Sequence, residues 1–558
     1  MPLNPELRSA LSATTDDQIV FDLAGIEARH QTILDQLPGV AVRFALKSCP
    51  VDEVIAALAG QGAGCDAASP HEIAQALRAG IPVDRIHYGN TSKSDQNIAD
   101  AYALGVRDFA TDSVEDVRAI AAHAPGARVF CRLATRGRGA LWGLSRKFGC
   151  SITDAVLVLE AARAAGLVPA GLSVHVGSQQ MRAESWRDAC DDLAEVIVAL
   201  GRRGIRLDHV NLGGGLPALG YLDRRGRPLD PPLDKIFATI RDGMQQLSAA
   251  SESALDFIVE PGRYLVADHG AIRAHVSRLS FRELIDGERQ YWLYLSVGKY
   301  NGLYEMDELQ YRLVFPTCTD AEYVPAVVAG PTCDSDDAYA HEEGLVQVPK
   351  TIESGSPVWI LSCGAYATSY TTTGFNGFTP LPYTTIRGAR VRHIAENDWA
   401  EIEQLEAGAY TASGLSEGRA ALESRARVSP ETCFVVELGQ RVVGYVLALP
   451  YPPFQYPDLH GLEVAGHESS NLHLHDMVIS EDMRGRGLGK FLLHHLMLTA
   501  RARLFERISA VAVGGADTFW SANGFHAHRG VDIPPSYGAD AVYLSRSVEV
   551  EDHGSYTQ

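Results

Sequence analysis

Several short stretches in the first half of the sequence combine residue types that could act on a carbonyl group and bind a phosphate. Lys47 ends the apolar run Phe44-Ala45-Leu46. An amine held in an apolar wall can lose its proton and form a Schiff base. Taken alone, Lys47 has a simpler interpretation, because strand ends carry solvated lysines more often than catalytic ones. Its neighbours in the expected fold decide between the two.

Two further motifs could bind a phosphorylated ring compound. The run Gly213-Gly214-Gly215 would let backbone N–H groups close around a phosphate, although tight turns use glycine too. Glu260-Pro261-Gly262-Arg263 places a carboxylate and a guanidinium within one turn. The carboxylate could pair with a ring nitrogen and the guanidinium with a phosphate. A third motif, His175-Val176-Gly177-Ser178, ends another apolar run.

The elements that must position these motifs form a strand–helix alternation from about residue 32 to residue 267, which predicts a parallel sheet or barrel. Eight short apolar runs are candidate strands, the number that a (β/α)8 barrel needs. They are residues 42–46, 64–67, 86–88, 108–110, 128–133, 171–175, 209–212 and 257–259. All the motifs fall at the C-terminal ends of these strands, the face on which barrel enzymes place their active sites.

The pattern of apolar and turn-forming residues changes along the rest of the chain, which predicts further domains. We expect residues 1–21 to join a β domain, 22–267 to form the barrel, and 268–386 to form that β domain, of sandwich or barrel-like type. Residues 387–550 read as a small α+β domain. The fold class is therefore α/β with two appended domains, which suits a length of 558 residues.

The last domain has its own chemical motif, Arg484-Gly485-Arg486-Gly487-Leu488-Gly489, between an expected strand (472–479) and an expected helix (490–503). Backbone N–H groups at a glycine-rich helix start form an anion site, although a basic glycine loop can be a solvated turn. His473 and His475 lie two residues apart on that strand. They could host a base or a metal, and a pair of satisfied core histidines is equally compatible with the spacing.

Composition narrows the ligand classes. The formal charge of -20 argues against a general nucleic-acid or anionic-membrane binder and favours small molecules. The nine cysteines contain no C-x-x-C pair, so neither a disulfide framework nor a zinc module is expected, and we expect no metal. No stretch reads as a membrane span or a targeting segment, which predicts a cytoplasmic protein.

Together and in this order the motifs of the first half resemble the ornithine/lysine/diaminopimelate decarboxylases, pyridoxal-phosphate enzymes with an alanine-racemase-like barrel. The matching stretches also include Gly64-Cys65-Asp66, Cys333-Asp334 and Gly364-Ala365-Tyr366. The resemblance implies that Lys47 binds pyridoxal 5'-phosphate covalently, that His175 packs on its ring, and that Glu260 pairs with the pyridine nitrogen. The implied cofactor-binding residues are Lys47, Asp66, Arg132, His175, Ser178, Gly213, Gly214, Gly215, Glu260, Gly262, Arg263 and Tyr366.

The same resemblance implies a substrate and a partner. Cys333 would be a catalytic proton donor reaching in from a second subunit, which implies a homodimer with shared active sites, and Asp334 would bind substrate. Asp at that position resembles ornithine and lysine enzymes, whereas diaminopimelate enzymes carry Glu. Lysine and ornithine differ by one methylene, so the sequence does not choose between them. A further acidic substrate residue could be Glu305, Asp307 or Glu308.

The last domain resembles the GNAT superfamily of N-acetyltransferases, which implies acetyl-CoA as co-substrate. The loop from Arg484 to Gly489 (Arg484, Gly485, Arg486, Gly487, Leu488 and Gly489) would bind the diphosphate, and backbone groups of Val478 and Ile479 the pantetheine arm. Many members place a general-acid Tyr where this chain has Trp520, so Tyr537 or Tyr543 would have to act instead.

Both resemblances together predict a bifunctional enzyme that decarboxylates lysine or ornithine and acetylates the diamine or a related amine. The alternatives are a diaminopimelate decarboxylase, an amino-acid racemase on the same barrel, and a non-catalytic decarboxylase-like regulator. Lys47, Glu260 and Cys333 are all present, which weighs against the regulator.

Overall fold

The computed structural model describes residues 5–143, 147–285, 287–318, 322–339, 344–438, 441–459, 461–538 and 540–548. The chain divides into two compact units. Leu7–Ile386 builds the first, and the second consists of the residues from Arg387 onward together with Pro5 and Glu6 from the start of the chain. The outermost residues of the expected end domains, 1–4 and 549–550, lie outside the described ranges.

The first unit begins with a closed barrel of eight parallel strands in the order β10-β11-β2-β3-β4-β5-β6-β8. These are the eight strands that the sequence predicted, so the barrel is confirmed. Their bounds are β2 (Val40–Ala45), β3 (Gly64–Ala67), β4 (Ile86–Tyr88), β5 (Asp108–Thr111), β6 (Arg128–Arg132), β8 (Val168–Ser173), β10 (His209–Asn211) and β11 (Asp256–Val259).

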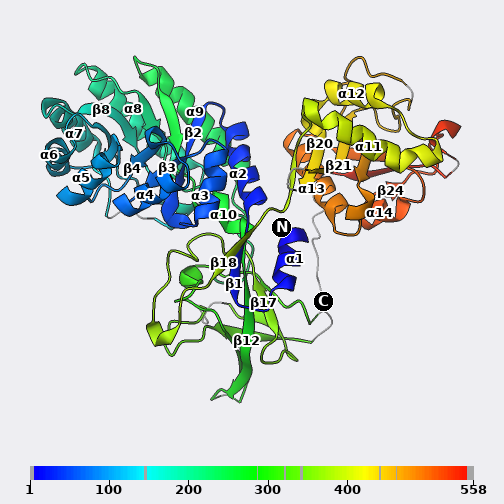
Figure 1. The fold of residues 1–558 in the computed structure, drawn as a ribbon, viewed down its shortest axis with the longest axis horizontal. Coiled ribbons are helices and arrows are strands. Elements are labelled where there is room, and N and C mark those ends of the chain that lie inside the picture. The colour runs from blue at the N-terminus through cyan, green and yellow to red at the C-terminus, as the bar shows by residue number, and fades with distance from the viewer. Residues whose placement is uncertain are drawn as a thin grey trace. The chain divides into compact units, whose positions relative to one another are not determined.

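Helices surround the barrel (Figure 1). They are α2 (Leu23–Gln36), α3 (Asp52–Gly60), α4 (Pro70–Arg78), α5 (Asp95–Ala103), α6 (Val114–His123), α7 (Ile152–Ala164), α8 (Glu184–Gly201), α9 (Leu233–Ala250) and the single turn α10 (Arg263–Val266). Four of them begin at a serine whose hydroxyl accepts the N–H group three residues on, which satisfies a donor that the helix leaves unpaired. The serines are Ser69, Ser94, Ser113 and Ser151.

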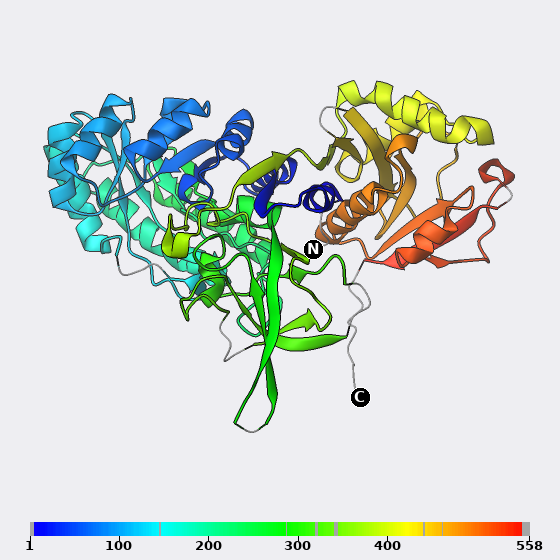
Figure 2. The ribbon, with the colours of Figure 1, turned by 60° about the horizontal axis from the view of Figure 1, so that its bottom comes forward.

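The β domain of this unit is a mixed eight-stranded sheet organised around one long strand, β12 (Gly270–Glu283) (Figure 2). The first part of β12 pairs with β1 (Gln18–Asp22) and β17 (Pro357–Ile360), and the part beyond a register shift at Val276 pairs with β13 (Arg289–Leu295). The remaining strands are β14 (Leu313–Val314), β15 (Tyr323–Ala329), β16 (Val346–Pro349) and β18 (Tyr383–Ile386). Strand β1 also pairs with β18, so the start of the chain completes this domain.

The second unit is α+β, as expected, with a seven-stranded sheet in the order β19-β20-β21-β22-β23-β25-β24. Helix α13 covers one face and helices α11 and α12 the other, each over its own apolar core. The bounds are β19 (Ala389–His393), α11 (Trp399–Tyr410), α12 (Arg419–Val428), β20 (Phe434–Leu438), β21 (Arg441–Pro450), β22 (Asn471–Ile479), α13 (Leu488–Ala502), β23 (Arg507–Ala512), α14 (Asp517–Ala522), β24 (His526–Ala527) and β25 (Val542–Ser547). Among the described residues, no helix has the length and apolar character needed to cross a membrane.

Candidate active sites

Lys47 stands at the C-terminal mouth of the barrel, in the turn Leu46–Ser48 that follows β2. Its Nζ lies 2.8 Å from Oδ2 of Asp66, the third residue of β3. Partial removal from water acts to lower the pKa of Lys47, but the Asp66 carboxylate raises that pKa above its ordinary value. Burial acts to raise the pKa of Asp66, but the Lys47 ammonium in turn lowers that pKa. Without a carbonyl partner, Lys47 is therefore an ammonium paired with a carboxylate.

Glu260, the residue after β11, lies in the same cluster. Its Oε1 accepts a hydrogen bond of 2.5 Å from Asn211 Nδ2 and lies 2.8 Å from Nε2 of His87 on β4. His87 also faces Asp66 Oδ1, at 3.3 Å. Asn211 and His87 were missed by the sequence analysis, because a single polar residue inside a three-residue strand forms no motif.

The glycine run forms a close-packed wall beside His175. Gly213 and Gly215 have positive φ values of 69° and 110°, which glycine adopts without strain. A Cβ at Gly213 would collide with the Val174 carbonyl, and one at Gly214 would lie 2.7 Å from the Glu260 carbonyl oxygen. Only glycines therefore fit where the ends of β8, β10 and β11 meet.

His175 lies beyond the end of β8, two residues after the last strand residue, although the sequence placed it within the strand. Its Nδ1 accepts a hydrogen bond from the Gly177 N–H at 3.3 Å. Burial, with help from the positive charges of Arg132 and Lys47, lowers the pKa of His175 to about 3. The imidazole is therefore neutral at physiological pH and suited to packing against an aromatic ring.

Arg263 is the centre of an anion site. It starts α10 directly after Gly262, whose Cβ position is closed off by Ser48. Its Nε and Nη2 donate to the Ser178 hydroxyl at 3.2 Å, and its guanidinium lies 4.8 Å from the ring centre of Tyr366. Ser178, Arg263 and Tyr366, named for the phosphate by the resemblance, are therefore together.

Glu305 occupies this anion site from the other side. It holds the Arg263 guanidinium by two contacts, Oε2 to Nη1 at 2.5 Å and Oε1 to Nη2 at 2.6 Å, and both side chains are buried. Asp307 pairs with Lys299 and Glu308 with Arg224, both near the surface. Among the three acidic candidates left open by the sequence, Glu305 alone contacts one of the expected cofactor residues in the described part of the chain.

Arg132, the last residue of β6, faces the same mouth. Its guanidinium lies 5.0 Å from the ring centre of Phe148. Burial lowers the pKa of Arg132, and the carboxylates of Glu260 and Asp66 act against that shift. Arg132 thus ends β6 at the same end of the barrel as Asp66 near the end of β3 and Glu260 after β11.

Cys333 and Asp334 lie elsewhere, on an exposed turn of the β domain after β15. The Cys333 N–H donates to Asn376 Oδ1 at 2.9 Å, and Asp334 accepts a 2.8 Å hydrogen bond from the Tyr300 hydroxyl. In the described residues of this chain, neither side chain has a hydrogen bond or ion pair to the Lys47 cluster.

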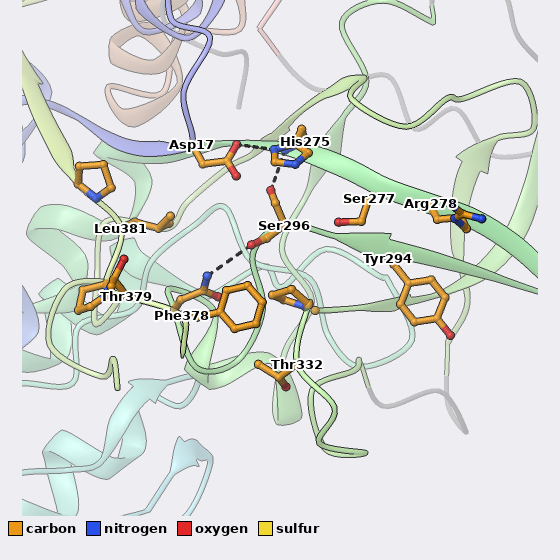
Figure 3. Close-up of a pocket in the computed structure, with 15 residues that line it drawn as sticks. Asp17, His275, Ser277, Arg278, Tyr294, Ser296, Thr332, Phe378, Thr379 and Leu381 are labelled. Atoms are coloured by element: carbon orange, nitrogen blue, oxygen red, sulfur yellow. Dashed lines mark hydrogen bonds and ion pairs between the residues drawn. The ribbon is translucent and has the colours of Figure 1, made fainter. Parts of the chain in front are cut away.

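A pocket of about 800 Å³ opens in the β domain next to this turn, and Figure 3 shows its lining. Asp17 Oδ1 lies 2.9 Å from Nδ1 of His275 on its wall, and Thr332, the residue before Cys333, lines it. The pocket is separate from the barrel mouth, because it contains none of the residues that surround Lys47.

In the second unit the expected glycine-rich segment lies between β22 and α13. The helix begins earlier than the expected residue 490, because Leu488 and Gly489 are its first two residues. Gly485 and Gly487 have φ values of 77° and 83°, and Gly487 is the residue that caps the start of the 15-residue helix α13. Strand β22 pairs with β23 only from Asn471 to Leu474, and the two strands separate beyond it. The edge of β22 that includes Val478 and Ile479 is therefore available for an extended ligand. This edge runs toward the N-terminal end of α13.

His475 lies where β22 separates from β23, at a register shift against β21. Its Nε2 is 2.7 Å from Oε1 of Glu417, whose Oε2 is 2.7 Å from Arg425. Beside it, Asp476 accepts hydrogen bonds from the hydroxyls of Tyr410 and Tyr445. His473 instead contacts the Ser509 hydroxyl at 3.0 Å.

The candidate acids of this unit are engaged in the fold. Tyr537 donates to the Pro457 carbonyl at 2.6 Å, Tyr543 accepts from the Phe454 N–H at 3.0 Å, and Trp520 packs between Phe519 and Phe525. Burial raises the pKa of Tyr537. The Glu417 and Asp476 contacts were missed, because residues in separate elements are involved.

The barrel mouth fits pyridoxal phosphate. It offers an amine beside a carboxylate, a second carboxylate with one oxygen close to both Asn211 and His87, a neutral imidazole, and an arginine–serine pair beside a glycine wall. This donor set matches, in turn, an aldehyde, a pyridine nitrogen, an aromatic ring and a phosphate.

Comparisons with known proteins agree with this geometry. Residues 23–267 match the family model "Pyridoxal-dependent decarboxylase, pyridoxal binding domain", and residues 399–525 match the model "Acetyltransferase (GNAT) family". Ornithine decarboxylase of Schizosaccharomyces pombe is 27% identical over 66% of this chain and 82% of its own length. Lysine/ornithine decarboxylase of Selenomonas ruminantium is 28% identical over 65% of this chain and 88% of its own length.

Solved structures are similar as well. Lysine/ornithine decarboxylase of Vibrio vulnificus, complexed with putrescine, has a TM-score of 0.59 at 26% identity and covers 68% of this chain and 97% of its own. Lysine decarboxylase of Selenomonas ruminantium has a TM-score of 0.59 at 25% identity and covers 69% and 96%. The chain therefore carries a pyridoxal-binding domain of the pyridoxal-dependent decarboxylases in its first unit and a GNAT acetyltransferase domain in its second.

Proposed function

We propose that this protein is a bifunctional enzyme that decarboxylates lysine or ornithine and acetylates an amine with acetyl-CoA. The observation that carries the first activity is the pairing of Lys47 with Asp66 beside Glu260 and the Arg263 anion site, all at one barrel mouth. When bound there, pyridoxal phosphate supplies an electron sink at the substrate α-carbon.

The residues of this chain have separate tasks in the proposal. Lys47 holds the cofactor, and Asp66 takes up or returns the proton at its Nζ. Glu260 keeps a proton at the ring nitrogen, and His175 packs on the ring. Arg263 and Ser178 bind the phosphate. Arg132, Gly262 and Tyr366 complete the walls of the site.

A homodimer is part of the proposal. Cys333 is exposed and Asp334 partly exposed on the β domain, and among the described residues neither has a hydrogen bond or ion pair with the Lys47 cluster of its own chain. A second copy can bring them to the barrel mouth, where the Cys333 thiol would deliver a proton to the product carbon. Asp334 would bind the distal ammonium, since a carboxylate acceptor suits a cation. A cytoplasmic location and the domain boundaries at residues 22, 268 and 387 also remain proposals.

Acetyl transfer is proposed for the second unit, with acetyl-CoA bound by the loop from Arg484 to Gly489 and by the edge of β22. His475 stands at the separation of β22 and β23, and Glu417 orients its imidazole. His475 is the base we propose for an amine acceptor, because its Nδ1 has no hydrogen-bond partner among the described residues. Burial and the nearby charge of Arg425 lower the pKa of His475 to about 3, so the imidazole is neutral at physiological pH and can accept a proton.

Mass spectrometry of the products from a mixture of lysine, ornithine, diaminopimelate and arginine tests the proposal. We expect cadaverine or putrescine from the wild type, and an acetylated amine only when acetyl-CoA is present. Lys47→Ala should abolish the diamine and the visible absorbance of the bound cofactor. Decarboxylation of diaminopimelate alone, or a diamine that is never acetylated, would contradict the corresponding half.

A further inference from the structure

His87 is the one histidine among the described residues that contacts two of the expected cofactor residues. It is the middle residue of β4, and its side chain is 1% exposed. Strand register places it directly beside Asp66 on β3. Its Nε2 lies 2.8 Å from Glu260 Oε1 and 3.3 Å from Asp66 Oδ1. Its ring packs on Phe130 of β6, with ring centres 5.1 Å apart.

These contacts divide the oxygen atoms of the two carboxylates. Asn211 and His87 both lie next to Oε1 of Glu260. The other oxygen, Oε2, is therefore left to face the ring nitrogen of a bound cofactor. Lys47 takes Oδ2 of Asp66, and His87 faces Oδ1. One imidazole thus joins the carboxylate expected at the ring nitrogen to the carboxylate expected at the lysine amine.

We propose that His87 is a positioning residue that holds Glu260 and Asp66 in register, and so couples the proton at the cofactor ring nitrogen to the proton at Lys47. The inference rests on the proposed cofactor site. It assigns His87 a role that neither the motifs nor the family description names.

The charges around His87 support this role. It faces Arg43 from β2, Asp66 from β3 and Glu260 after β11. Burial and Arg43 act to lower the pKa of His87, and the two carboxylates raise it above its ordinary value. A protonated His87 would add to the positive charges of Lys47, Arg43 and Arg132, which balance these two carboxylates.

The ligand atoms of Asp66, His87 and Glu260 also lie within 4.8 Å of one another, a geometry that could hold a metal ion. The Lys47 ammonium, 2.8 Å from Asp66, already occupies one of those carboxylates. Arg43 and Arg132 face the same two carboxylates. An added cation would therefore meet three positive side chains, which favours the positioning role.

The test compares His87→Phe and His87→Gln with His209→Phe in the full-length protein loaded with pyridoxal phosphate. His209 is the matched control, because it is a buried barrel histidine that packs on the same Phe130 ring, at 5.6 Å, and pairs with Asp208 instead. The measurements are a pH titration of the visible absorbance, the dissociation constant of pyridoxal phosphate, and the melting temperature.

We expect His87→Phe to move the titration midpoint upward by roughly one pH unit, because Asp66 and Glu260 lose a balancing group and stabilise bound protons more strongly. The dissociation constant of pyridoxal phosphate should rise by less than tenfold, since Glu260 loses one of the two groups next to its Oε1 but keeps its own charge. His87→Gln, which retains an N–H donor, should restore part of both changes. His209→Phe should lower the melting temperature and leave both quantities at their wild-type values.

Three results separate the possible failures. If His87→Phe shifts the midpoint no more than His209→Phe, the positioning role is wrong. If dialysis against a chelator or added Zn²⁺ moves the wild-type spectrum and leaves that of His87→Phe unchanged, the cluster is a metal site and the inference is overturned. If the wild type forms no visible band, or Lys47→Ala keeps it, the proposed function has failed, independently of His87.

Discussion

Replacing Glu305 by Gln would show whether this residue serves Arg263 or the substrate. The Arg263 side chain is 3% exposed, and its guanidinium makes two contacts, of 2.5 and 2.6 Å, with the Glu305 carboxylate. Removing one partner of a buried ion pair costs about 3–5 kcal/mol, because it leaves an uncompensated charge. The Gln carbonyl returns about 1–1.5 kcal/mol as one hydrogen bond. The net loss is then about 1.5–4 kcal/mol.

The expected change in melting temperature follows from the size of the unit. Unfolding entropy is about 2.1 cal/mol/K per residue, and Leu7–Ile386 spans 386 − 7 + 1 = 380 residues. The entropy is therefore about 0.8 kcal/mol/K, so the loss lowers the melting temperature by roughly 2–5 °C. Differential scanning calorimetry of the cofactor-free protein measures this directly.

Adding pyridoxal phosphate should reverse the loss. Its phosphate would supply the negative charge that Arg263 lacks in Glu305→Gln, so the cofactor should raise the melting temperature of the variant by more than that of the wild type. Asp307→Asn is the matched control: Asp307 stands two residues away, and its pair with Lys299 is partly exposed, worth about 1 kcal/mol or less. An unchanged melting temperature for cofactor-free Glu305→Gln, or equal cofactor effects in variant and wild type, would refute the reasoning.

Further predictions concern the other groups. Glu260→Gln should lower kcat about 100-fold or more, while the dissociation constant of pyridoxal phosphate changes less than tenfold; steady-state kinetics and absorbance titration check this. Asp334→Asn should raise KM for lysine and ornithine about tenfold, measured as CO2 release, because the distal ammonium loses a carboxylate. Gly485→Val should weaken acetyl-CoA binding at least tenfold by calorimetry, since a β-branched residue is strained at a φ of 77°, whereas Gly530→Val, on an open surface, should not. Urea unfolding should show the first unit losing stability as the pH falls from 7 to 5. Burial holds the folded pKa of His175 at about 3, whereas the unfolded value is about 6.5, so the unfolded chain binds a proton first. His175→Phe should reduce this loss of stability.

The barrel could be predicted from the sequence because each strand is a short apolar run followed by an amphipathic helix. The contacts inside it could not. Glu260 and His87 meet only because β4 and β11 are both strands of one closed barrel, and a single histidine between Ile86 and Tyr88 has no pattern. The available signal was its inward position beside Asp66, which becomes visible once the strands are placed in register.

Glu305 illustrates the same limit in a turn. Three acidic residues stand within four positions, and sequence spacing alone did not indicate which of them faces the barrel. The short turn Tyr304–Asp307 decides it, because it buries Glu305 and leaves Asp307 near the surface. The acetyltransferase loop was easier to predict, since its glycines and its helix start are adjacent in the chain.

The pairing of β1 with β18 has a consequence for biosynthesis. Ile19 lies beside Tyr383 in register. Strand β1, which is synthesised early, therefore cannot complete its pairing until β18, the last strand of the first unit, has been synthesised. Contacts so distant in sequence slow folding and leave strand edges exposed in the meantime. Since β18 ends at Ile386 and the sheet of the second unit begins with β19 at Ala389, the ribosome completes every strand of the first unit before it begins that second sheet. The fused domain therefore gives the nascent decarboxylase extra time, still tethered to the ribosome, to close its sheet before release.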